Sequence, residues 1–172
     1  MMPDESPARA YLALGSNIAP ETNLPAAVRE LAACGRIVRA SRVWETPPEG
    51  FPDQPHYLNA AVLLETTLSA ADLHDVAIAA IEHKLGRVRD PRNRNAPRTI
   101  DIDLALFNRD VLQVGHRRIP DPDILTRAFV AVPLAELDRD YVHPEDGRTL
   151  AAIAAALTAT MPEIRLRPDV RL

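Results

Sequence analysis

The sequence predicts an α+β domain of the ferredoxin-like kind, in which the order β-α-β-β-α-β gives an antiparallel sheet with helices packed on it. Two observations carry this prediction. Apolar residues alternate with other residues in four short segments, as in strands, and recur every three or four positions in two longer segments, as in amphipathic helices. The chain has 172 residues, of which 47% are hydrophobic and 26% charged, which suits one globular domain spanning residues 1–172.

The elements follow in order along the chain. We expect strands over residues 11–14, 37–44, 57–67 and 99–107. Helices are expected over residues 24–33, with Pro25 near the start, and from a Ser69 cap to Gly86. Beyond Val111 we expect a short strand, an interrupted helical stretch over 125–137 and a helix over 150–157 begun by Thr149, all added to the core fold. Residues 1–9 are expected to be flexible.

Composition excludes several classes of protein. The net charge is −4 and Cys34 is the only cysteine, so a surface that collects nucleic acid by charge, a disulfide scaffold and a zinc finger are not expected. The first ten residues carry acids and prolines rather than a cationic and then apolar signal, and the longest apolar run is too short to cross a membrane. We therefore expect a cytoplasmic protein without a membrane or nucleic-acid partner.

Asp101 and Asp103 form the first candidate site. Alternate residues of a strand project from the same face, so the two carboxylates converge opposite the isoleucines. One or two carboxylates together with substrate phosphates are a common way to hold Mg²⁺. The alternative for this pair alone is the solvated face of a half-exposed strand.

An arginine-rich segment directly precedes this strand. Residues 87–98 contain five arginines and one acid, Asp90, and guanidinium groups bind phosphate oxygens in pairs. A polyphosphate between arginines and carboxylate-bound Mg²⁺ is therefore the leading chemistry, and solvated loop charges are the alternative. Glu82 stands in the last turn of its helix, where a negative charge is unfavourable; it either braces Arg87 or Arg89 or contacts a ligand.

Five ordered blocks of the chain resemble the 6-hydroxymethyl-7,8-dihydropterin pyrophosphokinase family of folate biosynthesis: YLALGSN, ETPP, QPHYLNAAV, IEHKLGRVRD with APRTIDIDLALF, and RAFVAVPLAEL. The resemblance implies a ferredoxin-like monomer that transfers pyrophosphate from ATP to the hydroxymethyl group of a dihydropterin and releases AMP. It also implies two Mg²⁺ ions, held by Asp101 and Asp103.

The resemblance further implies the other site residues. Arg87 and Arg98 would be catalytic. The residues expected to bind ATP are Glu82, Arg87, Arg89, Arg94, Arg98, Ile102, Asp121 and Arg127. The pterin would lie between the rings of Tyr57 and Phe129, near Asn59, and the remaining residues expected at its edges are Thr46, Pro47, Pro48 and Asp101. The proline-rich segment 44–56 and the arginine-rich segment would act as lids that exclude water.

The chain departs from the family pattern at two positions. Asn95 stands where many members have a tryptophan, and Asp121 stands where they have a histidine. Asp121 either contacts the nucleotide, with a neighbouring arginine offsetting its charge, or caps the helical stretch that begins near Asp123. Two other functions stay open: a sister enzyme acting on another pterin, of the methanopterin type, and a noncatalytic module that binds an anion or RNA.

Overall fold

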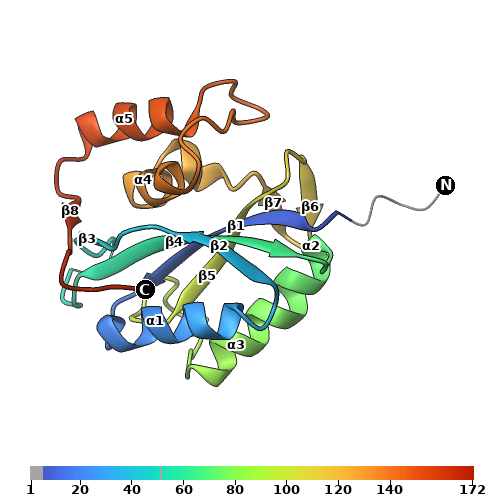
Figure 1. The fold of residues 1–172 in the computed structure, drawn as a ribbon. Coiled ribbons are helices and arrows are strands. Elements are labelled where there is room, and N and C mark those ends of the chain that lie inside the picture. Colours follow the sequence, from blue (N-terminus) through green and yellow to red (C-terminus); the bar gives the residue numbers. More distant parts are fainter. Residues whose placement is uncertain (1–5, 51) are drawn as a thin grey trace.

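The computed structural model describes residues 6–50 and 52–172, and its centre is an antiparallel sheet (Figure 1). The strand order is β5 (Asp101–Phe107), β1 (Ala8–Ser16), β4 (Tyr57–Thr66), β3 (Trp44–Thr46) and β8 (Arg165–Leu166). A further strand, β2 (Arg36–Ala40), also pairs with β4. The neighbours β1 and β5 are chemically important because their register pairs Gly15 with Asp101 and Ala13 with Asp103.

Helices cover both faces of the sheet (Figure 1). One face carries α1 (Pro20–Leu31) and the continuous helical segment formed by α2 (Ala70–Asp72), the π-helix η1 (Leu73–Ile78) and α3 (Ala79–Lys84). The other face carries α4 (Ala128–Leu137) and α5 (Leu150–Thr160). The core accordingly has two halves: Leu12 of β1 packs into the first and Tyr11 into the second. The ferredoxin-like order is confirmed, with α4 and α5 as the expected additions.

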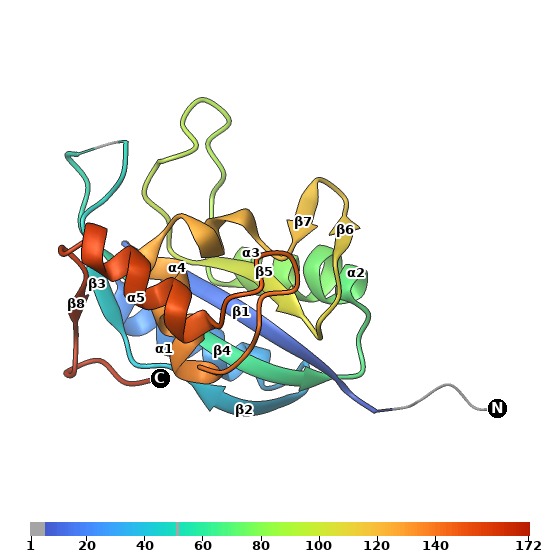
Figure 2. The ribbon, with the colours of Figure 1, turned by 90° about the horizontal axis from the view of Figure 1, so that it is seen from above.

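A small hairpin follows β5 in the chain and lies beside that strand (Figure 2). It consists of β6 (Leu112–Val114) and β7 (Arg117–Ile119), and it leads into the 3₁₀ helix η2 (Pro122–Leu125). The helical stretch expected over 125–137 is therefore two helices, η2 and α4, separated by Thr126 and Arg127. This hairpin places Arg117 beside β5, where it contacts Asp103.

Several predicted boundaries differ from the structure, two of them for a clear physical reason. The first helix begins at Pro20, four residues earlier than expected, because Pro20 rather than Pro25 occupies the first turn; Pro25 lies inside the helix. The strand expected over 37–44 is divided into β2 and β3. Ser41 interrupts it: the Ser41 hydroxyl accepts a hydrogen bond from the Ala61 amide at 2.8 Å, so a side chain takes the place of a ladder carbonyl.

Other expectations are confirmed. Ser69 caps its helix by accepting a hydrogen bond from the Asp72 amide, and Thr149 does the same for the Ala152 amide. Gly86 follows the helix with a positive φ of 79°, a conformation that favours glycine. The expectation that residues 1–9 are flexible was wrong for residues 8 and 9, because β1 begins at Ala8 and pairs with β4 there; residues 1–5 lie outside the described part.

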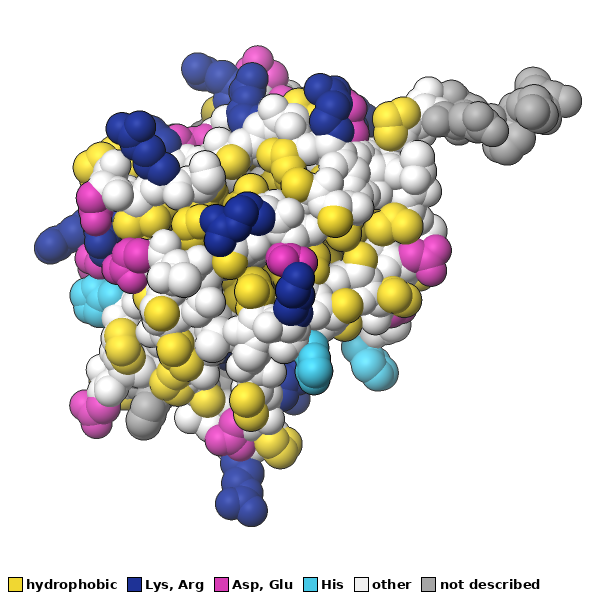
Figure 3. Space-filling view, turned by 60° about the horizontal axis from the view of Figure 1, so that its bottom comes forward, with side chains coloured by type: hydrophobic (Ala, Val, Ile, Leu, Met, Phe, Trp, Pro, Cys, Tyr) yellow, Lys and Arg dark blue, Asp and Glu magenta, His cyan; other side chains and the backbone are white. Residues whose placement is uncertain are grey.

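Seen from above, the proline-rich and arginine-rich segments project from the same side of the sheet (Figure 2). On the face covered by α1 and α3, by contrast, basic side chains stand apart among apolar and acidic ones (Figure 3). Among the described residues, no helix is long and apolar enough to cross a membrane. The place where arginines gather in this fold is therefore next to β5.

Candidate active site

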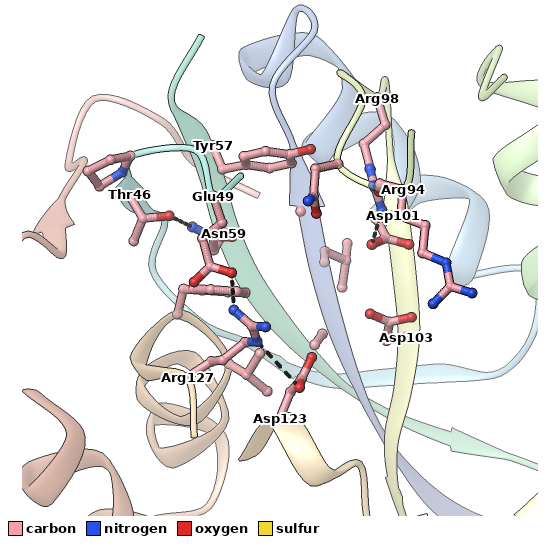
Figure 4. Close-up of a pocket in the computed structure, with 17 residues that line it drawn as sticks. Thr46, Glu49, Tyr57, Asn59, Arg94, Arg98, Asp101, Asp103, Asp123 and Arg127 are labelled. Atoms are coloured by element: carbon pink, nitrogen blue, oxygen red, sulfur yellow. Dashed lines mark hydrogen bonds and ion pairs between the residues drawn. The ribbon is translucent and has the colours of Figure 1, made fainter. Parts of the chain in front are cut away.

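A cavity of about 230 Å³ opens between the ends of β1, β4 and β5 and the start of α4 (Figure 4). Six of the seven residues expected to bind the pterin line this cavity: Thr46, Pro47, Tyr57, Asn59, Asp101 and Phe129. The seventh, Pro48, does not. Tyr57 and Phe129 are only half-buried, so both rings present surface to the cavity, although Phe129 also packs against the core.

Asn59 is held in one orientation within this cavity. Its Nδ2 donates hydrogen bonds to the Thr46 hydroxyl at 2.9 Å and to the Trp44 carbonyl at 3.3 Å. The opposite side of the amide faces Gly15, where an added Cβ would lie 3.5 Å from Oδ1 of Asn59. The backbone of β1 thus leaves room beside a fixed amide oxygen, which is suited to reading the edge of a flat heterocycle.

A second cavity of about 330 Å³ lies on the other side of the two aspartates. Five of the residues expected to bind ATP line it: Glu82, Arg87, Arg89, Arg98 and Ile102. The η1 segment contributes His74 and Asp75 to the same cavity. Arg94 and Arg127 instead line the first cavity. Three residues, Arg98, Asp101 and Asp103, belong to both cavities.

Arginines hold the two carboxylates at this junction. Asp101 receives Arg87 at Oδ1, at 2.9 Å, and Arg98 at Oδ2, at 3.0 Å. Asp103 receives Arg117 at Oδ1, at 2.5 Å. Burial and the nearby charge of Asp101 raise the pKa of Asp103, and Arg117 opposes that shift. A positive charge beside Asp103 therefore favours the ionised form of its carboxyl group.

Glu82 holds the start of the arginine-rich segment 87–98, which forms a loop (the arginine loop), in place. The carboxylate is buried, and it pairs with Arg87 at the start of that loop. Burial raises the pKa of Glu82, while the hydrogen bond from Arg87 lowers it. The unfavourable position of this acid at the end of its helix is thus explained by a specific partner, and Glu82 also reaches the second cavity.

The two lids are tied to each other and to β1. Gln54 of the proline-rich segment donates a hydrogen bond to the Asn95 carbonyl at 2.8 Å. Asn17 donates to Gln54 Oε1 at 2.8 Å and accepts from the Arg98 amide at 2.9 Å. Arg127 links α4 to the same region through ion pairs with Glu49 and Asp123 (Figure 4).

Asp121 lines neither of these cavities. Its Oδ1 accepts a hydrogen bond from the Asp123 amide at 2.9 Å and caps η2, which confirms the capping alternative. Its Oδ2 pairs with Arg117 at 2.9 Å. Asp121 thus caps η2 and pairs with Arg117, one of the arginines expected to offset its charge if it contacted the nucleotide.

The contributors to the site that sequence reasoning missed include Arg117, Asn17 and Gln54. Asn17 and Gln54 lie within blocks that carry the family resemblance, but nothing in a single sequence shows that they touch each other. Arg117 was considered only as a neighbour of Asp121. The four-residue spacing between Arg117 and Asp121 was a usable signal, whereas its contact with Asp103 depends on how the hairpin folds back on β5.

The fold and the paired cavities define a ferredoxin-like protein in which an arginine-lined, carboxylate-containing cavity lies beside a cavity with aromatic side chains. Residues 11–139 match the family model described as 7,8-dihydro-6-hydroxymethylpterin-pyrophosphokinase (HPPK), and the chain belongs to this family. The resemblance seen in the sequence is therefore confirmed.

Individual relatives agree with this assignment. The chain is 41% identical over 151 residues to 2-amino-4-hydroxy-6-hydroxymethyldihydropteridine pyrophosphokinase of Pseudomonas aeruginosa, covering 86% of this chain and 91% of that one. It is 41% identical over 131 residues to the enzyme of the same name from Bacillus subtilis, covering 74% and 77%.

A solved structure shows the same fold. The chain superimposes on Plasmodium falciparum HPPK-DHPS with a TM-score of 0.71 at 14% identity. The match covers 94% of this chain and 44% of that longer one, so this chain spans less than half of the Plasmodium protein.

Proposed function

We propose that this chain transfers pyrophosphate from ATP to the hydroxymethyl group of 6-hydroxymethyl-7,8-dihydropterin, giving the pterin diphosphate and AMP. The observation that carries the proposal is the junction of the two cavities. Arg98, Asp101 and Asp103 line both the arginine-rich cavity and the aromatic cavity, so a polyphosphate in one and a hydroxymethyl group in the other would meet at these three side chains.

The reaction itself fixes what the site must do. The hydroxymethyl oxygen attacks the β-phosphorus of ATP, the bond from that phosphorus to the α-phosphate oxygen breaks, and the hydroxyl proton is released. Little covalent chemistry is left for the protein, so positioning and charge neutralisation carry the catalysis. Arg87, Arg89 and Arg98 are the groups we assign to the triphosphate, with Arg87 and Arg98 closest to the carboxylates.

The donor set fits Mg²⁺. Asp101 and Asp103 share one face of β5, and among the described residues no cluster of three or more acids, histidines or cysteines stands ready to enclose a metal. Mg²⁺ prefers this arrangement, because it keeps waters and takes the remaining ligands from substrate phosphates. We therefore propose two Mg²⁺ ions held by Asp101 and Asp103, which when bound neutralise charge on the polyphosphate.

The pterin site is part of the same proposal. Tyr57 and Phe129 offer aromatic surface, and Asn59 with the backbone near Thr46 and Pro47 offers hydrogen bonds to the ring edges. Stacking supplies affinity and the fixed amide supplies identity. We also propose a monomer located in the cytoplasm, which agrees with the single cysteine of the chain.

A direct assay tests the function. Purified protein is incubated with ATP, Mg²⁺ and 6-hydroxymethyl-7,8-dihydropterin, and AMP and the pterin diphosphate are quantified by chromatography. We expect the two products in equal amounts and no AMP without the pterin. AMP formation that does not depend on any pterin, or no turnover with this pterin, would refute the proposal. Turnover with a methanopterin-type precursor alone would identify the sister enzyme instead.

A further inference from the structure

Arg117 is shared by two carboxylates that belong to different parts of the fold. Its Nη2 lies 2.5 Å from Oδ1 of Asp103, and its Nη1 lies 2.9 Å from Oδ2 of Asp121. The guanidinium thus forms a bridge from the candidate metal carboxylate to the N-terminal cap of η2. The sequence alone did not predict this bridge.

Asp121 fixes one end of the bridge. The residue is 5% exposed, its amide donates to the Ala105 carbonyl at 2.9 Å, and its second carboxylate oxygen is occupied by the Asp123 amide. Because the main chain of Asp121 and one of its carboxylate oxygens are both fixed in this way, the side chain has little freedom to follow Arg117. Arg117 is therefore tethered at a set distance from β5.

The partners of Asp101 differ from this tethered arginine. Arg87 and Arg98 flank the arginine loop and are the side chains we assign to the polyphosphate, so a ligand in the second cavity would draw them away from Asp101. Arg117 also lines this cavity, but it lies on β7 and shares its charge with Asp121, which is not part of the loop. Of the arginines that pair with the two carboxylates, Arg117 is the one that lies outside the arginine-rich segment 87–98.

We propose that Arg117 is the resident counter-ion of Asp103 and sets the affinity of the carboxylate pair for a divalent cation. Its guanidinium competes for Oδ1 of Asp103, so the nucleotide-free site binds a free cation weakly and takes one up mainly when a polyphosphate adds negative charge. Asp121 tempers this effect by sharing the positive charge of Arg117. The inference rests on the proposed function, because it assigns a cation to Asp103.

The two members of the bridge should act in opposite directions. In Arg117→Met a positive charge next to Asp103 is lost, and a cation should bind more tightly. In Asp121→Asn the side-chain oxygen still caps η2, but the negative charge is lost, the site becomes more positive, and a cation should bind more weakly. If the bridge served the stability of the fold alone, both substitutions would weaken cation binding or leave it unchanged.

Mn²⁺ titration followed by electron paramagnetic resonance measures this directly, without turnover. In the nucleotide-free protein we expect the Kd for Mn²⁺ to fall at least about threefold in Arg117→Met and to rise by a similar factor in Asp121→Asn. The matched control is Arg118→Met, because Arg118 is the next residue and pairs with the peripheral Glu145. The Kd of the Arg118→Met variant for Mn²⁺ should equal that of the wild type.

Titration with a non-hydrolysable ATP analogue completes the experiment. The factor by which the analogue tightens Mn²⁺ binding should be smaller in Arg117→Met than in the wild type. The reason is that the guanidinium that competes with the cation for Asp103 has already been removed. Equal Kd values in all variants, or shifts of the same sign in Arg117→Met and Asp121→Asn, would overturn the proposal. Arg117→Gln, which is neutral and polar, is the second variant and should reproduce the tightening if Arg117→Met unfolds.

These outcomes separate the inference from the proposed function. AMP formation in the assay above with unchanged Mn²⁺ affinities would leave the enzyme assignment standing and defeat the role of Arg117. Opposite shifts in Mn²⁺ affinity without any pterin-dependent turnover would support the counter-ion and defeat the assigned reaction.

Discussion

Arg98 donates a hydrogen bond from Nη1 to Oδ2 of Asp101 at 3.0 Å, joining the end of the arginine loop to the first carboxylate of β5. An arginine expected on the triphosphate and an aspartate expected on the metal therefore hold each other in this structure. Ligand binding at this site has to replace such internal ion pairs with contacts to phosphate and cation. Until the substrates bind, the ion pair keeps the two charged groups next to each other.

The carboxylates should be essential for turnover. Asp101→Asn and Asp103→Asn should each lower kcat by at least about 100-fold, because a lost metal ligand removes charge stabilisation worth several kcal/mol in the transition state. Steady-state AMP formation measures the loss, and circular dichroism checks that the fold persists. Near-normal activity in both variants would refute the metal assignment.

Two arginines of the same loop should differ in importance. Arg98→Ala should slow single-turnover product formation more than Arg94→Ala does. The main chain of Arg98 is fixed on both sides, since its amide donates to the Asn17 side chain and its carbonyl accepts from the Asn17 amide, and its guanidinium borders both cavities. Arg94 lies in the middle of the loop and borders only the first cavity. The reverse order of rates would contradict this ranking.

The ring of Tyr57 should bind the pterin by stacking. Tyr57→Ala should raise the KM for the pterin about tenfold, since an aromatic pair contributes on the order of 1 kcal/mol beyond its buried area. Tyr57→Phe keeps the ring and should stay near the wild type. The KM for ATP serves as the internal control, and equal effects of the two substitutions on the pterin would argue against stacking.

His143 should make the stability of the protein depend on pH. The buried side chain accepts hydrogen bonds at Nδ1 from the Glu145 and Asp146 amides, and among the described residues its Nε2 has no partner. Burial lowers the pKa of His143 below its usual value of 6.5. The unfolded chain therefore binds this proton more readily, and the stabilisation present above pH 6.5 is lost as the pH falls below it.

Chemical denaturation at pH 7.5 and 5.5 tests this sign. The loss of unfolding free energy on acidification should be larger in the wild type than in His143→Asn, in which an amide oxygen can accept the same two hydrogen bonds. His116→Asn, at an exposed position of the β6–β7 turn, controls for the removal of one histidine. A larger loss in His143→Asn than in the wild type would disprove the assignment.

Much of this molecule was predictable because its local signals agree with its fold. The alternation in 99–107 placed Asp101 and Asp103 on one face, and the caps at Ser69 and Thr149 marked helix starts that the structure confirms. Ser41 shows where the pattern fails: its neighbours have the apolar spacing of one strand, but its hydroxyl bonds to Ala61 and divides the strand. Hydrophobic periodicity does not show where a side-chain hydroxyl takes the place of a backbone carbonyl as the hydrogen-bond acceptor in a strand.

The site was predictable only in part for a related reason. The residue types and the family blocks identified the carboxylates, the arginines and the aromatic rings. The contacts among distant segments, such as Gln54 with Asn95 and Arg117 with Asp103, follow from the way loops and the hairpin fold over the sheet. A single sequence without its relatives does not show which distant residues are in contact.

Asn17 has a consequence for how this sequence can change. Its two amide ends hold Gln54 of one lid and the main chain of Arg98 at the base of the other. The positions of the two segments therefore depend on each other: a residue inserted or deleted between Asn95 and Arg98 would misplace the partner of Gln54. Engineering a new substrate preference into one lid should accordingly begin with paired libraries that vary both lids at once while leaving Asn17 untouched.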